Sequence, residues 1–464
     1  MNRSIHKPMA ALMVALVLCI ACSTTPPSTA TEPALERPTE AEMSPTSIAQ
    51  RFVSHMVEGR EAEARAMFTV QMAEAIGPTK LDALWDSLQD HMGTFTAIVA
   101  TRAQEHSSKG LTVVWLTATF AQGEQIDIQL AIDADHNVSG LFFKPIAQAW
   151  KPAEGMVNRE MFTETDLVFG QAPWVLPGTL SLPVGDGSWP GVVLVHGSGA
   201  HDRDETIGPN KPFKDIAWAL ASQGIAVLRY DKRNHALPQE VAARPPFTIA
   251  DEVLDDAAAA LAWMAQQPHI DPRRLVVLGH SHGAGLLFRI VAQASTPVAG
   301  AIALAAPGRP LEEMMVAQIT YISQLEGTAA TPAMVAEFTA AREKVKQLTD
   351  AERSDTETVL FGAHPAWWLD MRGFDPATEL ARVPRTLPLL FLQGERDYQV
   401  TPTDDFARWQ ALTQERSNAT TILFPGLSHL FIAGEGPPTP DTYRQPGHVA
   451  PEVIAALVSW LNAR

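Results

Sequence analysis

Along residues 48–150 the hydrophobic residues first repeat at helical spacing and then alternate as in strands. An early set shares one helical face, and it consists of Ile48, Phe52, Val53 and Met56. Alternation of apolar and polar residues then predicts strands with one buried face, at residues 94–101, 111–120, 125–133 and 138–143. Helices followed by strands indicate a small α+β domain over residues 48–150.

From residue 160 to the C-terminus, short apolar runs are separated by helical stretches. Such runs are typical of strands in a buried parallel sheet, and they lie at residues 191–195, 275–278, 299–304, 387–392 and 420–424. This order predicts an α/β fold. Residues 308–385 interrupt it with helical stretches and the pair Trp367-Trp368, so they are predicted to form a lid. Core packing is the simpler role for the two tryptophans.

The run at 275–278 leads into a glycine-rich turn, Gly279-His280-Ser281-His282-Gly283. A strand before it and a helical run after it match the context of the G-x-S-x-G nucleophile elbow. Ser281 would sit on a strained turn, where Gly279 and Gly283 leave space for the neighbouring strand and helix. Ser281 is therefore the candidate nucleophile, and an incidental serine in a βα turn is the alternative. His280 and His282 are expected to point away from its hydroxyl.

A serine nucleophile needs a base, and the base needs an acid that orients it. Asp397 follows the run at 387–392, and His429 lies in the loop before the last helix. The chain order Ser, Asp, His is that of the α/β-hydrolases. We therefore predict a triad of Ser281, Asp397 and His429. Structural or capping roles are expected for the nearby competitors, which are Glu395, Asp404, Asp405 and His448.

The run at 191–195 ends in a second glycine-rich turn, His196-Gly197-Ser198-Gly199. A turn at this place normally faces the elbow and offers backbone N–H groups to the carbonyl oxygen as it becomes negative. We predict the amides of Ser198 and His282 as these oxyanion donors. A phosphate-binding loop is the alternative, but a Walker-type lysine and the rest of a nucleotide fingerprint are missing.

The same turn opens a longer motif, His196-Gly-Ser-Gly-Ala-His-Asp-Arg-Asp-Glu205, which is followed by residues 208–212 and 228–233. Together with the tail at 434–449, it resembles the secreted bacterial α/β-hydrolase esterases that carry H-G-S-G-x-x-D-R-D-E. The resemblance covers residues 160–464 and implies an α/β-hydrolase fold and ester hydrolysis. Members commonly read G-H-S-L-G-G at the elbow, whereas this chain has His282 and Ala284. Residues 48–150 resemble the NTF2-like domains that precede some secreted hydrolases, and a spacer role is favoured there.

Composition excludes several kinds of partner. The 464 residues include 35 basic and 52 acidic side chains, and the resulting net charge of −17 repels nucleic acid and anionic membrane surfaces. Both cysteines, Cys19 and Cys22, lie near the N-terminus, so the folded part has no thiols for disulfides or metal sites. We expect a small-molecule ester as the partner, with no metal and no organic cofactor.

The N-terminal segment has the pattern of an export signal. Arg3 and Lys7 precede an apolar stretch at 9–20 that is too short to span a bilayer. The ending 19–23 resembles the bacterial lipobox, so we predict a signal peptide over residues 1–22 with lipid on Cys22. Simple signal-peptidase cleavage nearby is the alternative. Residues 23–47 lack large apolar side chains and are predicted to be a disordered tether. We expect an exported lipoprotein, periplasmic or outer-membrane-associated, that meets the membrane only through this anchor.

These features predict a serine carboxylesterase that forms an acyl-enzyme on Ser281. Short acyl esters are favoured because charges interrupt the lid region, at Glu312, Glu313, Arg342, Glu343, Lys344 and Lys346. A serine peptidase or thioesterase of the same fold is one alternative, and a non-catalytic binding lipoprotein is another. The presence of all three triad side chains argues against the second alternative.

Overall fold

The computed structural model describes residues 44–106, 110–121, 125–145, 150–325 and 330–464. They form two compact units, which divide near residue 149. The predicted signal segment, Cys22 and the predicted tether up to residue 43 lie outside the described residues. Ser44 caps the first helix, α1 (Pro45–Val57), by accepting a hydrogen bond from the amide of Ser47. Residues 45–47 of the predicted tether are therefore helical.

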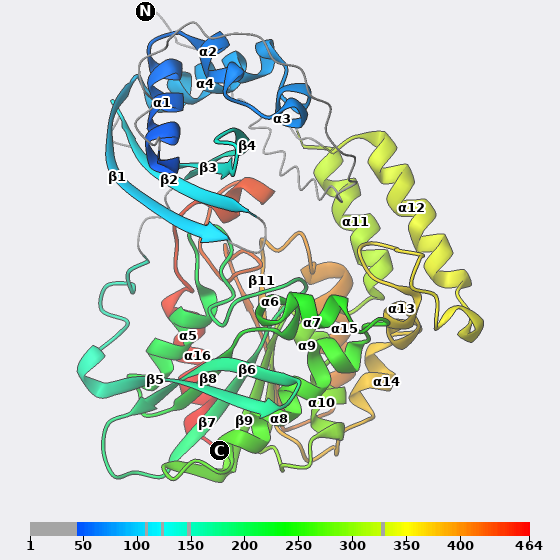
Figure 1. Cartoon of the computed structure of the whole chain (residues 1–464). Helices are drawn as coiled ribbons and strands as arrows, with labels where there is room; N and C mark the ends of the chain where they lie inside the picture. Colours follow the sequence, from blue (N-terminus) through cyan, green and yellow to red (C-terminus); the bar gives the residue numbers. More distant parts are fainter. Residues whose placement is uncertain (1–43, 107–109, 122–124, 146–149, 326–329) are drawn as a thin grey trace, which may run out of the picture. The chain divides into compact units, whose positions relative to one another are not determined.

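In its described residues, the N-terminal unit packs helices against one antiparallel sheet (Figure 1). Its helices are α1, α2 (Glu61–Ala66), α3 (Val70–Ala75) and α4 (Pro78–Met92). Its strands pair in the order β1 (Phe95–His106), β2 (Leu111–Phe120), β3 (Gln125–Asp133) and β4 (Val138–Pro145). Alternate residues of β3, including Ile128 and Leu130, share a core with Phe52 and Trp85. The predicted α+β architecture is confirmed.

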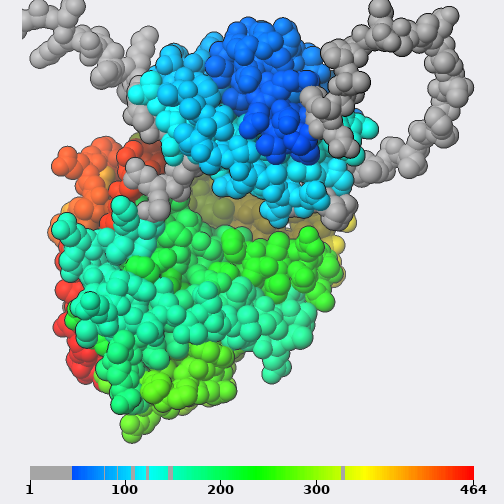
Figure 2. Space-filling model, turned by 60° about the vertical axis from the view of Figure 1, so that its left-hand side comes forward, coloured from blue at the N-terminus to red at the C-terminus, as the bar shows by residue number. Residues whose placement is uncertain are grey.

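The C-terminal unit is built on an eight-stranded sheet with the order β12-β11-β10-β9-β7-β8-β6-β5. Neighbours from β8 to β12 are parallel, and β6 pairs antiparallel with both β5 and β8. The strands are β5 (Phe162–Gln171), β6 (Trp174–Pro183), β7 (Trp189–Val195), β8 (Ala226–Tyr230), β9 (Ile270–His280), β10 (Gly300–Leu304), β11 (Leu389–Gly394) and β12 (Ala419–Phe424). Strands β5 and β6 lie at one edge of the sheet, in a part of the chain that covers much of the surface turned to the viewer in Figure 2.

Helices cover both faces of this sheet (Figure 1). Successive residues of a central strand enter opposite cores, so that Val193 and Val277 belong to one core and Val192 and Leu278 to the other. The first core includes residues of α8 (Asp255–Met264), α10 (Leu287–Gln293) and α15 (Ala407–Thr413). The second includes residues of α5 (Pro212–Ala221) and α16 (Pro451–Asn462). Burial on both faces explains why the strands read as apolar runs without alternation.

Residues 308–385 lie between β10 and β11 and are largely helical, in agreement with the pattern. They contain α11 (Leu311–Ser323), α12 (Pro332–Gln347), α13 (Pro365–Met371) and α14 (Pro376–Leu380). Trp367 and Trp368 of α13 belong to the first hydrophobic core. Three of the charges expected to interrupt the lid instead join two helices of this segment, since Arg342 and Lys346 of α12 pair with Glu313 of α11. Among the described residues, no helix is both long and apolar enough to cross a membrane.

Candidate active site

The turn after β9 holds Ser281 in a strained conformation. Its φ of 52° and ψ of −118° are rare for a residue with a side chain. The turn closes tightly: a Cβ on Gly279 would lie 2.5 Å from the carbonyl oxygen of Gly283, and a Cβ on Gly283 would lie 2.5 Å from that of Val195. Both elbow positions therefore require glycine. The chain then enters α9 (His282–Gly285), whose N-terminus adjoins the serine.

Asp397 and His429 meet in the loops that follow β11 and β12. The Nδ1 atom of His429 lies 2.6 Å from Asp397 Oδ2, the distance of a charge-assisted hydrogen bond. Asp397 Oδ1 accepts bonds from the amides of Gln399 and Val400, which fix the carboxylate. Both partners are buried, and His429 lines the same cavity as Ser281. Because Nδ1 is engaged, Nε2 is the ring nitrogen left to exchange a proton with a serine hydroxyl.

The competing residues are engaged elsewhere. Glu395 accepts a bond from the amide of Gly426 and is exposed. Asp405 accepts from the amide of Gly308 and pairs with Arg309. His448 lies 2.9 Å from Asp215. Each of these contacts holds one segment of the chain to another, as predicted for structural residues.

The turn after β7 is fixed from two sides, which positions the amide of Ser198. The amide of Gly197 donates to Glu205 Oε1 at 2.6 Å, and the Gly197 carbonyl accepts from Lys232 Nζ at 3.0 Å. Within the described part of the chain, the amides of Ser198 and His282 donate to no other group. Both residues line the cavity around Ser281. The two amides are therefore free to bind an oxygen there.

Glu205 and His280 form a buried contact that sequence reasoning missed. His280 Nδ1 lies 3.0 Å from Glu205 Oε2, and His280 Nε2 lies 3.0 Å from the carbonyl oxygen of His429. Burial raises the pKa of Glu205, but His280, His196 and His201 together outweigh burial and lower this pKa to about 2. Burial by itself lowers the pKa of His280, but the charge of Glu205 acts the other way, and the pKa of His280 lies above its usual value. The pair is an ion pair that links the oxyanion turn, the elbow and the loop of His429.

A second buried group lies under the side chain of His282. Glu252 of the helical turn η3 (Ala250–Leu254) accepts from Lys232 Nζ at 2.7 Å and from Trp367 Nε1 at 2.6 Å. Trp367 in turn stacks on the His282 ring, with 5.4 Å between centroids and 24° between planes. Burial lowers the pKa of His282 to about 4, so the ring is neutral at neutral pH. The two tryptophans of the insertion are thus both core residues and cavity residues.

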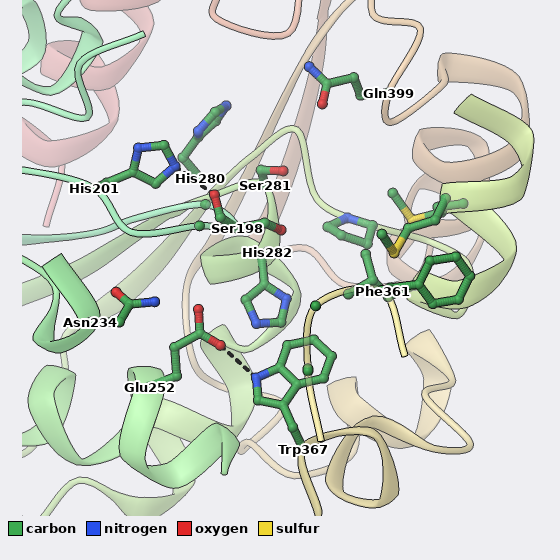
Figure 3. A pocket seen from close by; sticks show the side chains of 18 of the residues that line it. Ser198, His201, Asn234, Glu252, His280, Ser281, His282, Phe361, Trp367 and Gln399 are labelled. Carbon is green, nitrogen blue, oxygen red and sulfur yellow. Dashed lines mark hydrogen bonds between the residues drawn. The ribbon is translucent and has the colours of Figure 1, made fainter. Parts of the chain in front are cut away.

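One cavity of about 810 Å³ surrounds Ser281 (Figure 3). One group of its polar lining residues, called the polar wall below, is Asn234 of α6 (Arg233–Ala236), Glu252 and His282. The insertion contributes a group of apolar lining residues, called the apolar wall below: Leu311, Met314, Met315 and Phe361. Figure 3 shows the polar wall on one side of the cavity and Phe361 on the other. No lysine or arginine is among the described lining residues.

Comparison with known proteins identifies the family. Residues 192–439 match the model described as alpha/beta hydrolase family. The chain belongs to this family. Residues 49–141 match a model described as protein of unknown function (DUF3887). These matches confirm the predicted α/β-hydrolase fold, whereas the narrower resemblances to secreted esterases and NTF2-like domains stay predictions.

A curated relative is esterase EstD of Thermotoga maritima. It is 36% identical over 410 residues, which are 88% of this chain and 93% of the relative. This relationship confirms the prediction of a serine hydrolase of the carboxylic-ester type.

Solved structures with lower similarity include two esterases and a peptidase. An esterase of Pyrococcus furiosus is 16% identical with a TM-score of 0.43, covering 68% of this chain and 95% of its own. An esterase of Pyrobaculum calidifontis is 15% identical with a TM-score of 0.43, and the match covers 65% of this chain and 85% of the esterase chain. A puromycin-hydrolyzing peptidase of Mycobacterium tuberculosis is 16% identical with a TM-score of 0.43, and the match covers 76% of this chain and 46% of the peptidase chain.

Proposed function

We propose that the chain is a serine carboxylesterase that hydrolyses short-chain, uncharged acyl esters through an acyl-enzyme on Ser281. The observation that carries the proposal is the 2.6 Å contact between His429 and Asp397 beside the cavity that Ser281 lines. A buried carboxylate on Nδ1 selects the imidazole tautomer whose Nε2 accepts a proton. Acyl transfer to a serine requires such an oriented base.

In the proposed reaction, His429 Nε2 takes the proton of the Ser281 hydroxyl as the oxygen attacks the ester carbonyl. Asp397 stabilises the imidazolium that forms. The amides of Ser198 and His282 bind the oxygen that becomes negative. The imidazolium then protonates the departing alcohol, which leaves an acyl group on Ser281. Water attacks this acyl-enzyme with His429 as the base, and the carboxylic acid is released.

The charges around the cavity favour uncharged substrates. Glu205 and Glu252 line the cavity but are already paired with His280 and Lys232. A substrate carboxylate would lose its hydration without meeting a free cation among the described lining residues, which is costly. Neutral esters avoid this cost.

The apolar wall favours a short acyl chain. Its positions on α11, Leu311, Met314 and Met315, span about one helical turn, roughly 5–6 Å. Gln318, one turn further along α11, also lines the cavity, and its amide donates to the carbonyl of Gln399. The apolar stretch that α11 offers is therefore short. A short acyl group matches it better than a fatty acyl chain does.

Labelling with a fluorophosphonate probe tests the nucleophile. We expect the wild type to be labelled and Ser281→Ala to be unlabelled and inactive on p-nitrophenyl butyrate. Ser323→Ala is the matched control, because Ser323 lies on α11 outside the cavity lining and should be labelled. Labelling of Ser281→Ala, or none of the wild type, would overturn the proposal. Faster turnover of a butyryl anilide or thioester than of the oxygen ester would favour the peptidase or thioesterase alternative.

A further inference from the structure

The polar wall contains two side chains that bond to nothing in the described part of the chain. Asn234 Oδ1 and His282 Nε2 are buried without a hydrogen-bond partner. His282 is only 3% exposed. Buried polar groups are nearly always hydrogen-bonded, and leaving one unpaired destabilises the protein. Because both side chains line the cavity of Ser281, a ligand in that cavity is the natural partner.

The neighbouring side chains hold the His282 ring in place but give its Nε2 atom no hydrogen bond. Its ring stacks on Trp367, and Trp367 is fixed by its bond to Glu252. Both carboxylate oxygens of Glu252 are occupied, one by Trp367 and the other by Lys232. The imidazole thus keeps its orientation while its buried Nε2 atom has no hydrogen-bond partner in the described part of the chain. Figure 3 shows this ring between the Ser281 turn and Trp367.

The chemistry of this wall selects a neutral group that both donates and accepts. The amide of Asn234 offers an acceptor oxygen and donor N–H groups, and a neutral imidazole offers one of each. His282 is neutral at neutral pH, because burial lowers its pKa to about 4. A ligand anion would find no free cation, and a ligand cation would meet Glu252 already paired. A hydroxyl group has the matching donor and acceptor.

We propose that Asn234 and His282 form a hydroxyl-binding subsite, so that the preferred ester carries a hydroxyl group on one side of the reacting carbonyl. The apolar wall receives the other, unsubstituted side. This inference rests on the proposed function, because it places the ester at Ser281. Because the proposed function places the acyl part against the apolar wall, the alcohol part is the expected carrier of the hydroxyl; a hydroxyl on the acyl part would mean that the ester binds in the opposite direction. Each origin is tested by its own pair of substrates.

Matched esters that differ by hydroxyl groups test the subsite on the purified full-length chain. For the acyl part, p-nitrophenyl 3-hydroxybutyrate is compared with p-nitrophenyl butyrate. For the alcohol part, glyceryl butyrate is compared with propyl butyrate in a pH-stat. In one of the two pairs we expect kcat/KM to be higher for the hydroxylated ester by about tenfold or more. A ratio near one in both pairs would overturn the inference.

Two variants remove the proposed contacts independently. His282→Phe keeps a ring against Trp367 and keeps the backbone amide, while Asn234→Leu keeps the approximate size of the side chain. In each, we expect the preference to fall toward one. His235→Phe is the control, because His235 lies next to Asn234 but is exposed and outside the cavity lining. Its preference should match that of the wild type.

The results separate this inference from the proposed function. If both variants are labelled by the fluorophosphonate probe and retain the full hydroxyl preference, the subsite is refuted while the esterase stands. If the wild type is neither labelled nor active on any ester, the proposed function fails and this inference fails with it. The probe also reports whether each variant has folded around Ser281, and one folded variant suffices for the test.

Discussion

Replacing Glu205 by glutamine should weaken the fold and the reaction together. Its carboxylate accepts from Gly197 in the oxyanion turn and pairs with His280 in the elbow, and His280 contacts the His429 carbonyl. Glu205 itself has a φ of 51°, so its loop is held in a rare conformation. Glutamine keeps the size and one acceptor but removes the charge. The substitution therefore tests the charge of Glu205.

The expected loss of stability in Glu205→Gln can be estimated from the pKa of Glu205. A fall of the Glu205 pKa from 4.5 to about 2 corresponds to about 3 kcal/mol of stabilisation. Removing one partner of a buried ion pair commonly costs about 3–5 kcal/mol. We expect the free energy of unfolding to fall by about 3 kcal/mol in Glu205→Gln. Displacement of the reacting groups by about 1 Å would lower kcat by roughly a hundredfold.

The stabilisation should depend on pH in a defined direction. The folded-state pKa of Glu205 is depressed, so its contribution is present above 4.5 and is lost as the pH falls toward 2. The folded-state pKa of His280 is raised, so its contribution is complete below 6.5 and is lost as the pH rises through the raised value. The wild type should therefore exceed the variant most between pH 4.5 and 6.5.

Urea denaturation at several pH values, with kcat measured on p-nitrophenyl butyrate, checks this prediction. Glu395→Gln is the matched control: Glu395 also accepts from a backbone amide, but it is exposed and has no ion-pair partner within the described chain. Its unfolding curve should follow that of the wild type. Equal stability of Glu205→Gln and the wild type across the pH range, with unchanged kcat, would refute the proposed link between the three loops.

Three further predictions concern the acid, the acyl chain and the anchor. Asp397→Asn should lose roughly 10³–10⁴ in kcat with little change in binding, because asparagine holds the wrong imidazole tautomer; greater damage from Glu395→Gln would show that the acid is misassigned. Across p-nitrophenyl esters, kcat/KM should peak from acetyl to butyryl and fall by octanoyl, since each buried methylene contributes only about 0.8 kcal/mol and the apolar stretch on α11 is short; a rise toward palmitoyl, or activation by emulsified triglyceride, would contradict it. Palmitate labelling and membrane association should vanish in Cys22→Ala, and unchanged labelling in that variant would remove the proposed anchor.

The sheet and the elbow could be predicted because their signals are local. An apolar run marks a strand buried on both faces, and the pattern G-x-S-x-G marks a tight turn only when a strand and a helix flank it. Asp397 and His429 could be predicted for the same reason, because each residue follows a strand that is recognisable in the sequence. Parallel strands bring their carboxyl ends to one edge of the sheet, so residues distant in sequence meet there. Chain order and strand position were enough to group them.

The Glu205–His280 pair could not be predicted, because it depends on contacts across the fold. The two residues are 75 positions apart, and they meet because β7 and β9 are parallel neighbours in the sheet. Glu205 ends the motif that begins at His196, so the motif marked the residue without indicating its partner. The charges of residues 308–385 were a poor guide to the lining of the cavity for a similar reason. Sequence cannot tell a charge that faces the cavity from Glu313, which joins α11 to α12.

Polar pairs suit the three loops around Ser281 better than apolar packing would. A hydrophobic contact has no preferred direction, whereas the bond from the Gly197 amide to Glu205 fixes the angle at which that turn presents its next amide. The Nε2 atom of His280 meets the His429 carbonyl in the same directional way. Charges cost desolvation when buried, and here that cost is offset by mutual pairing. An aligned set of loops is what preorganised oxyanion stabilisation requires, and His280 supplies the contacts that join the elbow to the other two loops.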